Sequence, residues 1–101
     1  MKFTIKKPKE NILNLLRRLS YSPQGEDEKT GEMAFSRFLT PGGYPRFHLY
    51  VKETENELIL NLHLDQKKPS YPGAAAHNAE YEGDTVERET ERIKQSLKNS
   101  C

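Results

Sequence analysis

The sequence predicts an α+β fold: a two-layer domain in the order helix, three antiparallel strands, helix, with both helices on one face of the sheet. Residues 46–52 and 58–65 alternate apolar and polar side chains, which is the period of a half-buried strand. Residues 8–19 and 84–97 instead repeat apolar side chains at the spacing of a helix. A chain of 101 residues is expected to form one domain spanning residues 1–101.

The first predicted helix runs from about Pro8 to Leu19. Proline suits the first position of a helix, and the apolar residues recur three and four positions apart: Ile12, Leu15, Leu16 and Leu19. We expect residues 1–7 to be a short extended arm. Residues 22–28 combine a Ser-Pro-Gln-Gly sequence with three acids, which indicates an exposed loop.

The first predicted strand, Met33–Leu39, is irregular because Arg37 shares a face with Phe35. A β-bulge near Ser36 would reconcile this pattern with a strand. A Thr-Pro-Gly-Gly turn at residues 40–43 then leads into a hairpin formed by the two alternating segments.

The register of that hairpin follows if Glu55 and Asn56 form a two-residue turn. Three apolar pairs then face the core: Phe47 with Leu64, Leu49 with Leu62 and Val51 with Leu60. Three pairs lie on the opposite, polar face: Arg46 with Asp65, His48 with His63 and Tyr50 with Asn61. The register therefore gathers two histidines and an aspartate on one face of the sheet.

A long loop over residues 66–83 separates the hairpin from the last predicted helix. Asp84 begins this helix, and Glu87 three residues later completes a pair resembling a capping box. Its apolar stripe is narrow and consists of Val86, Thr90, Ile93 and Leu97.

Composition excludes some classes of protein. The single cysteine, Cys101, permits no intramolecular disulfide. Apolar runs are too short to span a bilayer, and the lysine-rich start lacks the apolar core of a secretory signal. The sequence therefore predicts a cytoplasmic protein without a membrane partner. It contains no nucleophile elbow or glycine-rich phosphate loop, so an enzyme is less expected than a binding protein.

Our main functional prediction is a small, non-enzymatic binding domain. Its working surface would be the polar sheet face together with the 66–83 loop, and its partner a protein or a nucleic acid, because exposed aromatic and basic side chains suit both. The residues expected to bind are Arg46, His48, Tyr50, His63, Asp65, Lys67, Lys68 and Tyr71.

An alternative prediction is a zinc site on His48 and His63. Side chains directly opposite on neighbouring strands have Cβ atoms about 4.5–5.5 Å apart, close enough for two imidazoles to bind one ion at about 2 Å. Asp65 and His77 could complete the ligand set. The competing interpretation is two exposed histidines, with Asp65 paired to Arg46. Unless zinc binds there, no cofactor is expected.

A third prediction is nucleic-acid binding through the basic N-terminal segment, since residues 1–20 contain six basic residues and one acid. The predicted order of elements resembles that of double-stranded RNA-binding domains. Their last helix begins with lysines, however, whereas residues 84–89 here are Asp-Thr-Val-Glu-Arg-Glu. No residue role is transferred from that resemblance.

Three segments support another resemblance: residues 48–52 (His-Leu-Tyr-Val-Lys), residues 63–71 and residues 76–83 (Ala-His-Asn-Ala-Glu-Tyr-Glu-Gly). They resemble segments of small, uncharacterised (hypothetical) bacterial proteins of unknown function. The resemblance covers most of the chain and implies no activity, cofactor or partner.

Overall fold

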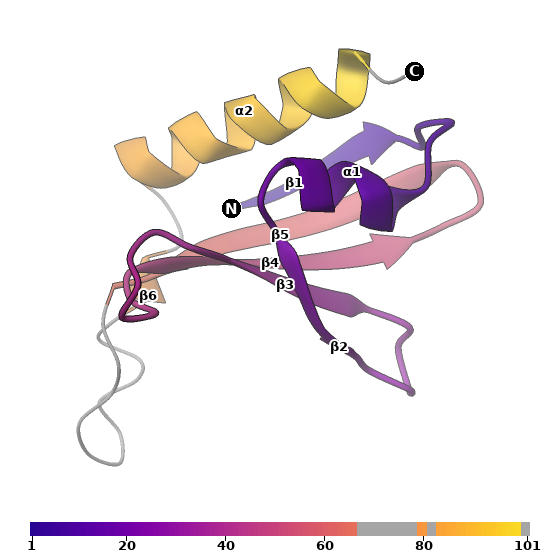
Figure 1. The fold of residues 1–101 in the computed structure, drawn as a ribbon. Coiled ribbons are helices and arrows are strands. Elements are labelled where there is room, and N and C mark those ends of the chain that lie inside the picture. Colours follow the sequence, from indigo (N-terminus) through magenta and orange to yellow (C-terminus); the bar gives the residue numbers. More distant parts are fainter. Residues whose placement is uncertain (67–78, 81–82, 100–101) are drawn as a thin grey trace.

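The computed structural model describes residues 1–66, 79–80 and 83–99. In this part of the chain, five antiparallel strands follow the order β1-β5-β4-β3-β2, and a two-residue strand, β6, pairs with the end of β5. Helices α1 and α2 lie on the same side of the sheet (Figure 1). The bounds are β1 Lys2–Lys6, α1 Ile12–Arg18, β2 Ser22–Glu26, β3 Met33–Phe38, β4 Arg46–Glu53, β5 Glu57–Asp65, β6 Ala79–Glu80 and α2 Asp84–Asn99.

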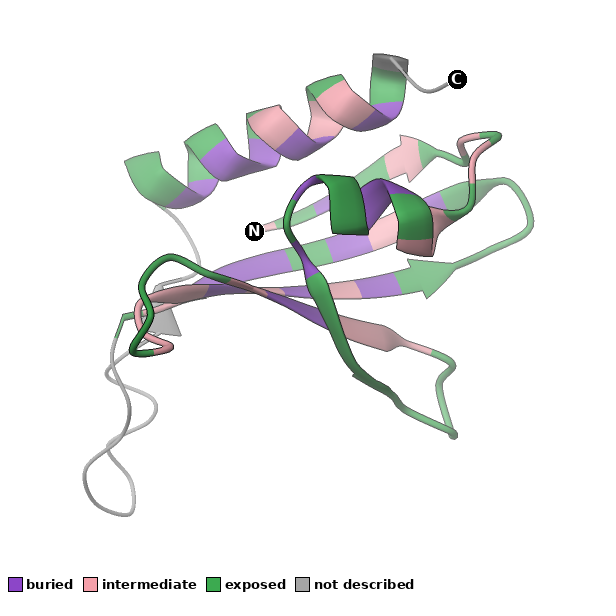
Figure 2. Ribbon diagram, in the orientation of Figure 1, coloured by how far each residue is buried: buried purple, intermediate pink, exposed green. Residues whose placement is uncertain are grey.

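The core lies between the sheet and the two helices. Alternate residues of β4 from Phe47 to Val51 and of β5 from Leu58 to Leu64 are buried there, and buried positions on α2 turn toward the sheet (Figure 2). The α2 stripe is buried as the helical spacing predicts. The buried apolar residues are Phe3, Leu15, Leu16, Leu19, Tyr21, Phe35, Phe47, Leu49, Val51, Leu58, Leu60, Leu62, Leu64, Val86, Ile93 and Leu97.

The β4–β5 hairpin has the predicted register. All six predicted pairs are present, including His48 opposite His63 and Arg46 opposite Asp65. The Glu55–Asn56 turn is closed by a backbone hydrogen bond between its flanking residues: the Thr54 amide donates to the carbonyl of Glu57 over 2.9 Å.

The α+β class is confirmed, but the three-stranded layout is wrong because both flanking segments are also strands. Residues 1–7 are more than an extended arm, since β1 pairs along its whole length with β5. Residues 22–26, predicted as a loop, form β2 against β3. Every residue of β2 is exposed, so no apolar alternation marks it as a strand.

Two finer predictions are also wrong. The register shift lies in β2, between Pro23 and Gly25, and β3 pairs regularly with β4 through Ser36. The helix α1 begins at Ile12 instead of Pro8, because the Asn11 side chain caps it by accepting the amide of Leu13 over 2.8 Å. With β1 preceding α1, the element order also departs from the expected helix–strands–helix series.

The predicted loop over residues 66–83 includes the short strand β6, whose Ala79 pairs with Asp65. Predicted binding residues Lys67, Lys68 and Tyr71, and the possible ligand His77, lie outside the described residues. Neither helix in the described part of the chain has the length and apolar character needed to cross a bilayer.

Candidate functional site

Two histidines and one carboxylate meet on the polar face of the β4–β5 hairpin. His48 and His63 are directly opposite, and their ring centroids lie 5.1 Å apart in an edge-on arrangement. Asp65 follows two positions after His63 on β5, so its side chain lies on the same face. Its Oδ2 is 3.2 Å from His48 Nδ1 and its Oδ1 is 3.3 Å from His63 Nε2. One carboxylate therefore bridges both imidazoles.

This arrangement has the dimensions of a metal site. One ligand atom from each of His48, His63 and Asp65 lies within 4.8 Å of the others. Atoms bound at about 2.0–2.1 Å around a tetrahedral zinc ion lie about 3.3 Å apart, which is close to both nitrogen–oxygen distances. The same distances suit hydrogen bonds between imidazole and carboxylate, so the cluster is held together without an ion.

The expectation of two exposed histidines is wrong for His63, which is only 8% exposed. Tyr50 stacks on the His63 ring at 5.8 Å between centroids, and it also contacts His48 at 5.5 Å. The side chains of His48 and Asp65 are 19% and 20% exposed. The cluster is therefore a largely covered site with a small opening to solvent.

Arg46 borders the cluster on the Asp65 side, as the predicted pairing requires. Its Nε lies 3.6 Å from Asp65 Oδ2, and its guanidinium carbon lies 4.5 Å from the centroid of the Tyr44 ring. The Phe38 ring lies 5.9 Å away. Phe38 ends β3 and Tyr44 lies in the segment that follows. The alternation within the β4–β5 hairpin does not predict that either ring contacts Arg46.

Ser36 is a further polar residue in the same cross-strand row. It lies on β3 directly opposite His48, is fully buried, and its Oγ has no hydrogen-bond partner among the described residues. Most buried hydroxyl groups are hydrogen-bonded. Ser36 was not among the predicted site residues, because only the β3–β4 register places it beside His48.

Burial lowers the pKa of both histidines below the ordinary value of 6.5. The carboxylate of Asp65 acts in the opposite direction, while Arg46 adds to the lowering at His48 and His48 adds to it at His63. Both imidazoles are therefore neutral at pH 7, which is the form that binds a metal ion.

The lowered pKa values predict how the metal-free protein responds to acid. Well above pH 6.5 the histidines are neutral in folded and unfolded chains; as the pH falls through about 6.5, the unfolded chain takes up protons first. The free energy of unfolding should therefore decrease between about pH 7 and pH 5.5. Urea unfolding at several pH values measures this slope. A double variant, His48→Gln with His63→Gln, should have a flatter profile, and an unchanged profile would contradict the prediction.

Comparison with known proteins adds no functional assignment. No family model matches the chain, and neither the curated proteins nor the solved structures provide a match.

Proposed function

We propose that the protein binds a divalent transition-metal ion, zinc in the first place, through His48, His63 and Asp65. The observation that carries the proposal is the convergence of three ligand atoms within 4.8 Å on neighbouring strands. Two imidazoles and a carboxylate form a donor set typical of zinc. Three protein ligands leave a coordination position open to water or to a group from another molecule.

The rigidity of the sheet supports this proposal. His48 and His63 project from directly opposite positions of two neighbouring strands in a regular antiparallel ladder, and Asp65 is fixed by the same ladder opposite Arg46. Ligands held by paired strands need little reorganisation to bind an ion, which favours affinity. The small exposed fraction of these side chains also favours a small ligand over a macromolecule. Binding of a macromolecular partner at this face stays a prediction.

Arg46 provides an electrostatic test, because its positive charge opposes a cation near Asp65. Zinc titration calorimetry on the metal-free protein should show one bound ion. His63→Gln and Asp65→Asn should each weaken binding by more than about tenfold, a loss that even removal of an outer-shell partner can cause. Arg46→Gln should instead strengthen binding, since it removes the opposing charge and leaves all three ligands.

Two further residues must be controlled in this titration. Cys101→Ser removes a thiol that could bind zinc independently, and His77→Ala tests a ligand outside the described residues. Asn61→Ala is the matched control, because Asn61 is exposed on the same sheet face and is not a proposed ligand. No zinc binding by the parent protein, or equal binding by parent and His63→Gln, would contradict the proposal.

A further inference from the structure

A groove of about 390 Å³ lies between β1 and α2, away from the histidine cluster. Its apolar part comes from Ile5 and Leu97, and the rest from Thr4 and three lysines, Lys6, Lys94 and Lys98. None of these three lysines forms an ion pair with another described residue. Lys94 instead lies 5.4 Å from the centre of the Phe3 ring. The groove thus combines an apolar lining with three positive charges and no lining acid.

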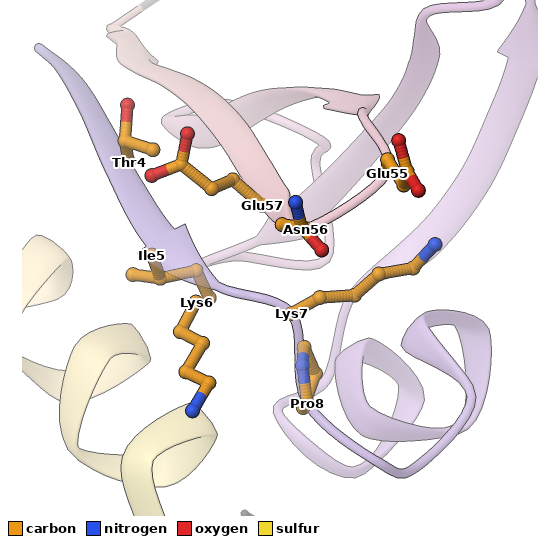
Figure 3. A pocket seen from close by; sticks show the side chains of 8 residues that line it. All are labelled: Thr4, Ile5, Lys6, Lys7, Pro8, Glu55, Asn56 and Glu57. Carbon is orange, nitrogen blue, oxygen red and sulfur yellow. The ribbon is translucent and has the colours of Figure 1, made fainter.

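At the C-terminal end of β1, no acidic side chain of the described residues neutralises the positive charge that Lys6 brings to the groove. Glu57 is the residue opposite Lys6 on β5. Figure 3, which shows a neighbouring hollow of about 700 Å³, has the two side chains pointing in opposite directions, with Lys6 directed toward the yellow helix α2. Lys7 points away from that helix and pairs with Glu53 at 2.5 Å. Lys6 is therefore the lysine of this segment that belongs to the groove.

The backbone of β1 adds directional hydrogen-bonding groups beside the groove. Met1 and Leu62 exchange two backbone hydrogen bonds, and the Lys7 amide donates to the Asn56 carbonyl. In an antiparallel ladder, hydrogen-bonded pairs alternate with pairs that are not hydrogen-bonded. Since Met1 and Lys7 both bond to β5, the odd-numbered residues of β1 form its hydrogen-bonded pairs. The even-numbered residues, Lys2, Thr4 and Lys6, therefore direct their amides and carbonyls outward. No described strand occupies that side of β1.

The other edge of the sheet is a poorer site for strand addition. Its strand β2 contains Pro23, which has no amide hydrogen, and its register shifts between Pro23 and Gly25. Strand β1 has neither feature, and α2 runs above it. An added strand at β1 would pair with the sheet and lie beside the groove at the same time.

We propose that β1 and α2 bind an extended acidic peptide as an additional strand of the sheet. Main-chain hydrogen bonds to Lys2, Thr4 and Lys6 would supply affinity, and alternate side chains would supply specificity. Peptide residues opposite Lys2 and Lys6 are acidic, because opposite charges facing each other stabilise a ladder. The residues opposite Phe3 and Ile5 are apolar, since those positions face the helical layer.

Charge and backbone geometry favour an acidic peptide over two other occupants, a second copy of β1 and a nucleic acid. In an antiparallel pairing of two β1 strands centred on Thr4, Lys2 of each copy would face Lys6 of the other, and like charges directly opposite are destabilising. Nucleic acid would satisfy the lysines, but its phosphates offer no match to the alternating amides and carbonyls of a strand edge. An acidic peptide matches the charges of Lys2 and Lys6, the apolar lining and the outward backbone groups together.

A designed peptide tests the proposal without knowledge of a natural partner. The probe is fluorescein-labelled Ser-Glu-Val-Thr-Val-Glu-Ser, and its control has Lys in place of both Glu residues. Fluorescence anisotropy should show saturable binding of the acidic probe and none of the control. Amide shifts in heteronuclear NMR spectra should concentrate on residues 2–6 and 94–98. N-methylation of the probe's paired backbone amides should abolish binding.

Charge reversal gives the decisive comparison. The double variant Lys2→Glu with Lys6→Glu should lose at least about tenfold in affinity for the acidic probe and gain binding to the lysine control. Both positions are exposed, and circular dichroism checks that the variant stays folded. Retained binding of the acidic probe by the variant, binding of the N-methylated probe, or displacement by single-stranded DNA but not by unlabelled peptide would overturn the proposal. So would self-association through β1 detected by sedimentation.

Discussion

Replacing Glu89 by alanine should lower the free energy of unfolding by about 1.5–3 kcal/mol, the range for hydrogen bonds to a charged group, because it removes a buried carboxylate acceptor. Glu89 is 4% exposed and lies on α2 beneath three donors. Its carboxylate accepts from the Tyr21 hydroxyl at 2.6 Å, from Arg92 Nε at 2.8 Å and from Arg37 at 3.2 Å. Removing it takes the ion-pair partner from Arg37 and Arg92 and leaves the buried Tyr21 hydroxyl without this acceptor. Urea unfolding followed by circular dichroism measures the loss.

Three variants separate this network from a general effect on α2. Glu89→Gln keeps the volume and one acceptor, so it should cost less than alanine. Glu91→Ala is the matched control on the same helix, because Glu91 is exposed and its loss should change stability by about 0.5 kcal/mol or less. Tyr21→Phe should cost less in the Glu89→Ala background than alone, since the two share a hydrogen bond. Equal costs for Glu89→Ala and Glu91→Ala would contradict the assigned role.

Burial and the neighbouring carboxylate raise the pKa of Tyr21 well above its ordinary value, so the hydroxyl stays protonated and donates to Glu89. The bond joins residues 68 positions apart in the chain, and Arg37 lies 52 positions from Glu89. Residue spacing places Arg37 on the same face of β3 as Phe35, and nothing in that spacing indicates Glu89 as its partner. Such a network escapes sequence patterns because it depends on how α2 packs across the sheet.

The parts of the fold that could be predicted are those in which one local rule decides the outcome. Alternation and a two-residue turn determine the β4–β5 register, since a slip by one residue would expose the leucines. That register brings His48, His63 and Asp65 together. The same rules could not find β2, because none of its side chains is buried and its strand character comes from the backbone ladder with β3.

The surroundings of the candidate site were less predictable for a related reason. Ser36 adjoins His48 only because β3 adds to the hairpin in one register, and Tyr50 covers His63 through ring stacking that depends on rotamers. A pattern of residue types assigns a face to each side chain, but it does not say how much of that face is covered. The burial of His63 on the polar face is the clearest example.

Replacing Leu62 by alanine should cost about 2–5 kcal/mol, the range for a fully buried leucine whose removal leaves a cavity. Leu62 has no exposed surface, and it pairs with Leu49, which is also fully buried. It lies on β5, the strand between β1 and β4 that also contacts α2. Neighbouring backbone is therefore held on both sides and has little freedom to close the cavity. Chemical unfolding of the two proteins under identical conditions gives the difference.

The same experiment tests the register when Asn61→Ala is measured beside it. Asn61 is adjacent in sequence but exposed on the opposite face, so its replacement should change stability by about 0.5 kcal/mol or less. Leu62→Met keeps the volume and should cost less than about 1.5 kcal/mol. In a hairpin shifted by one residue, Asn61 and His63 would face the core and Leu62 would face solvent. A larger loss for Asn61→Ala than for Leu62→Ala would therefore contradict both the core and the pairing that assembles the proposed zinc ligands.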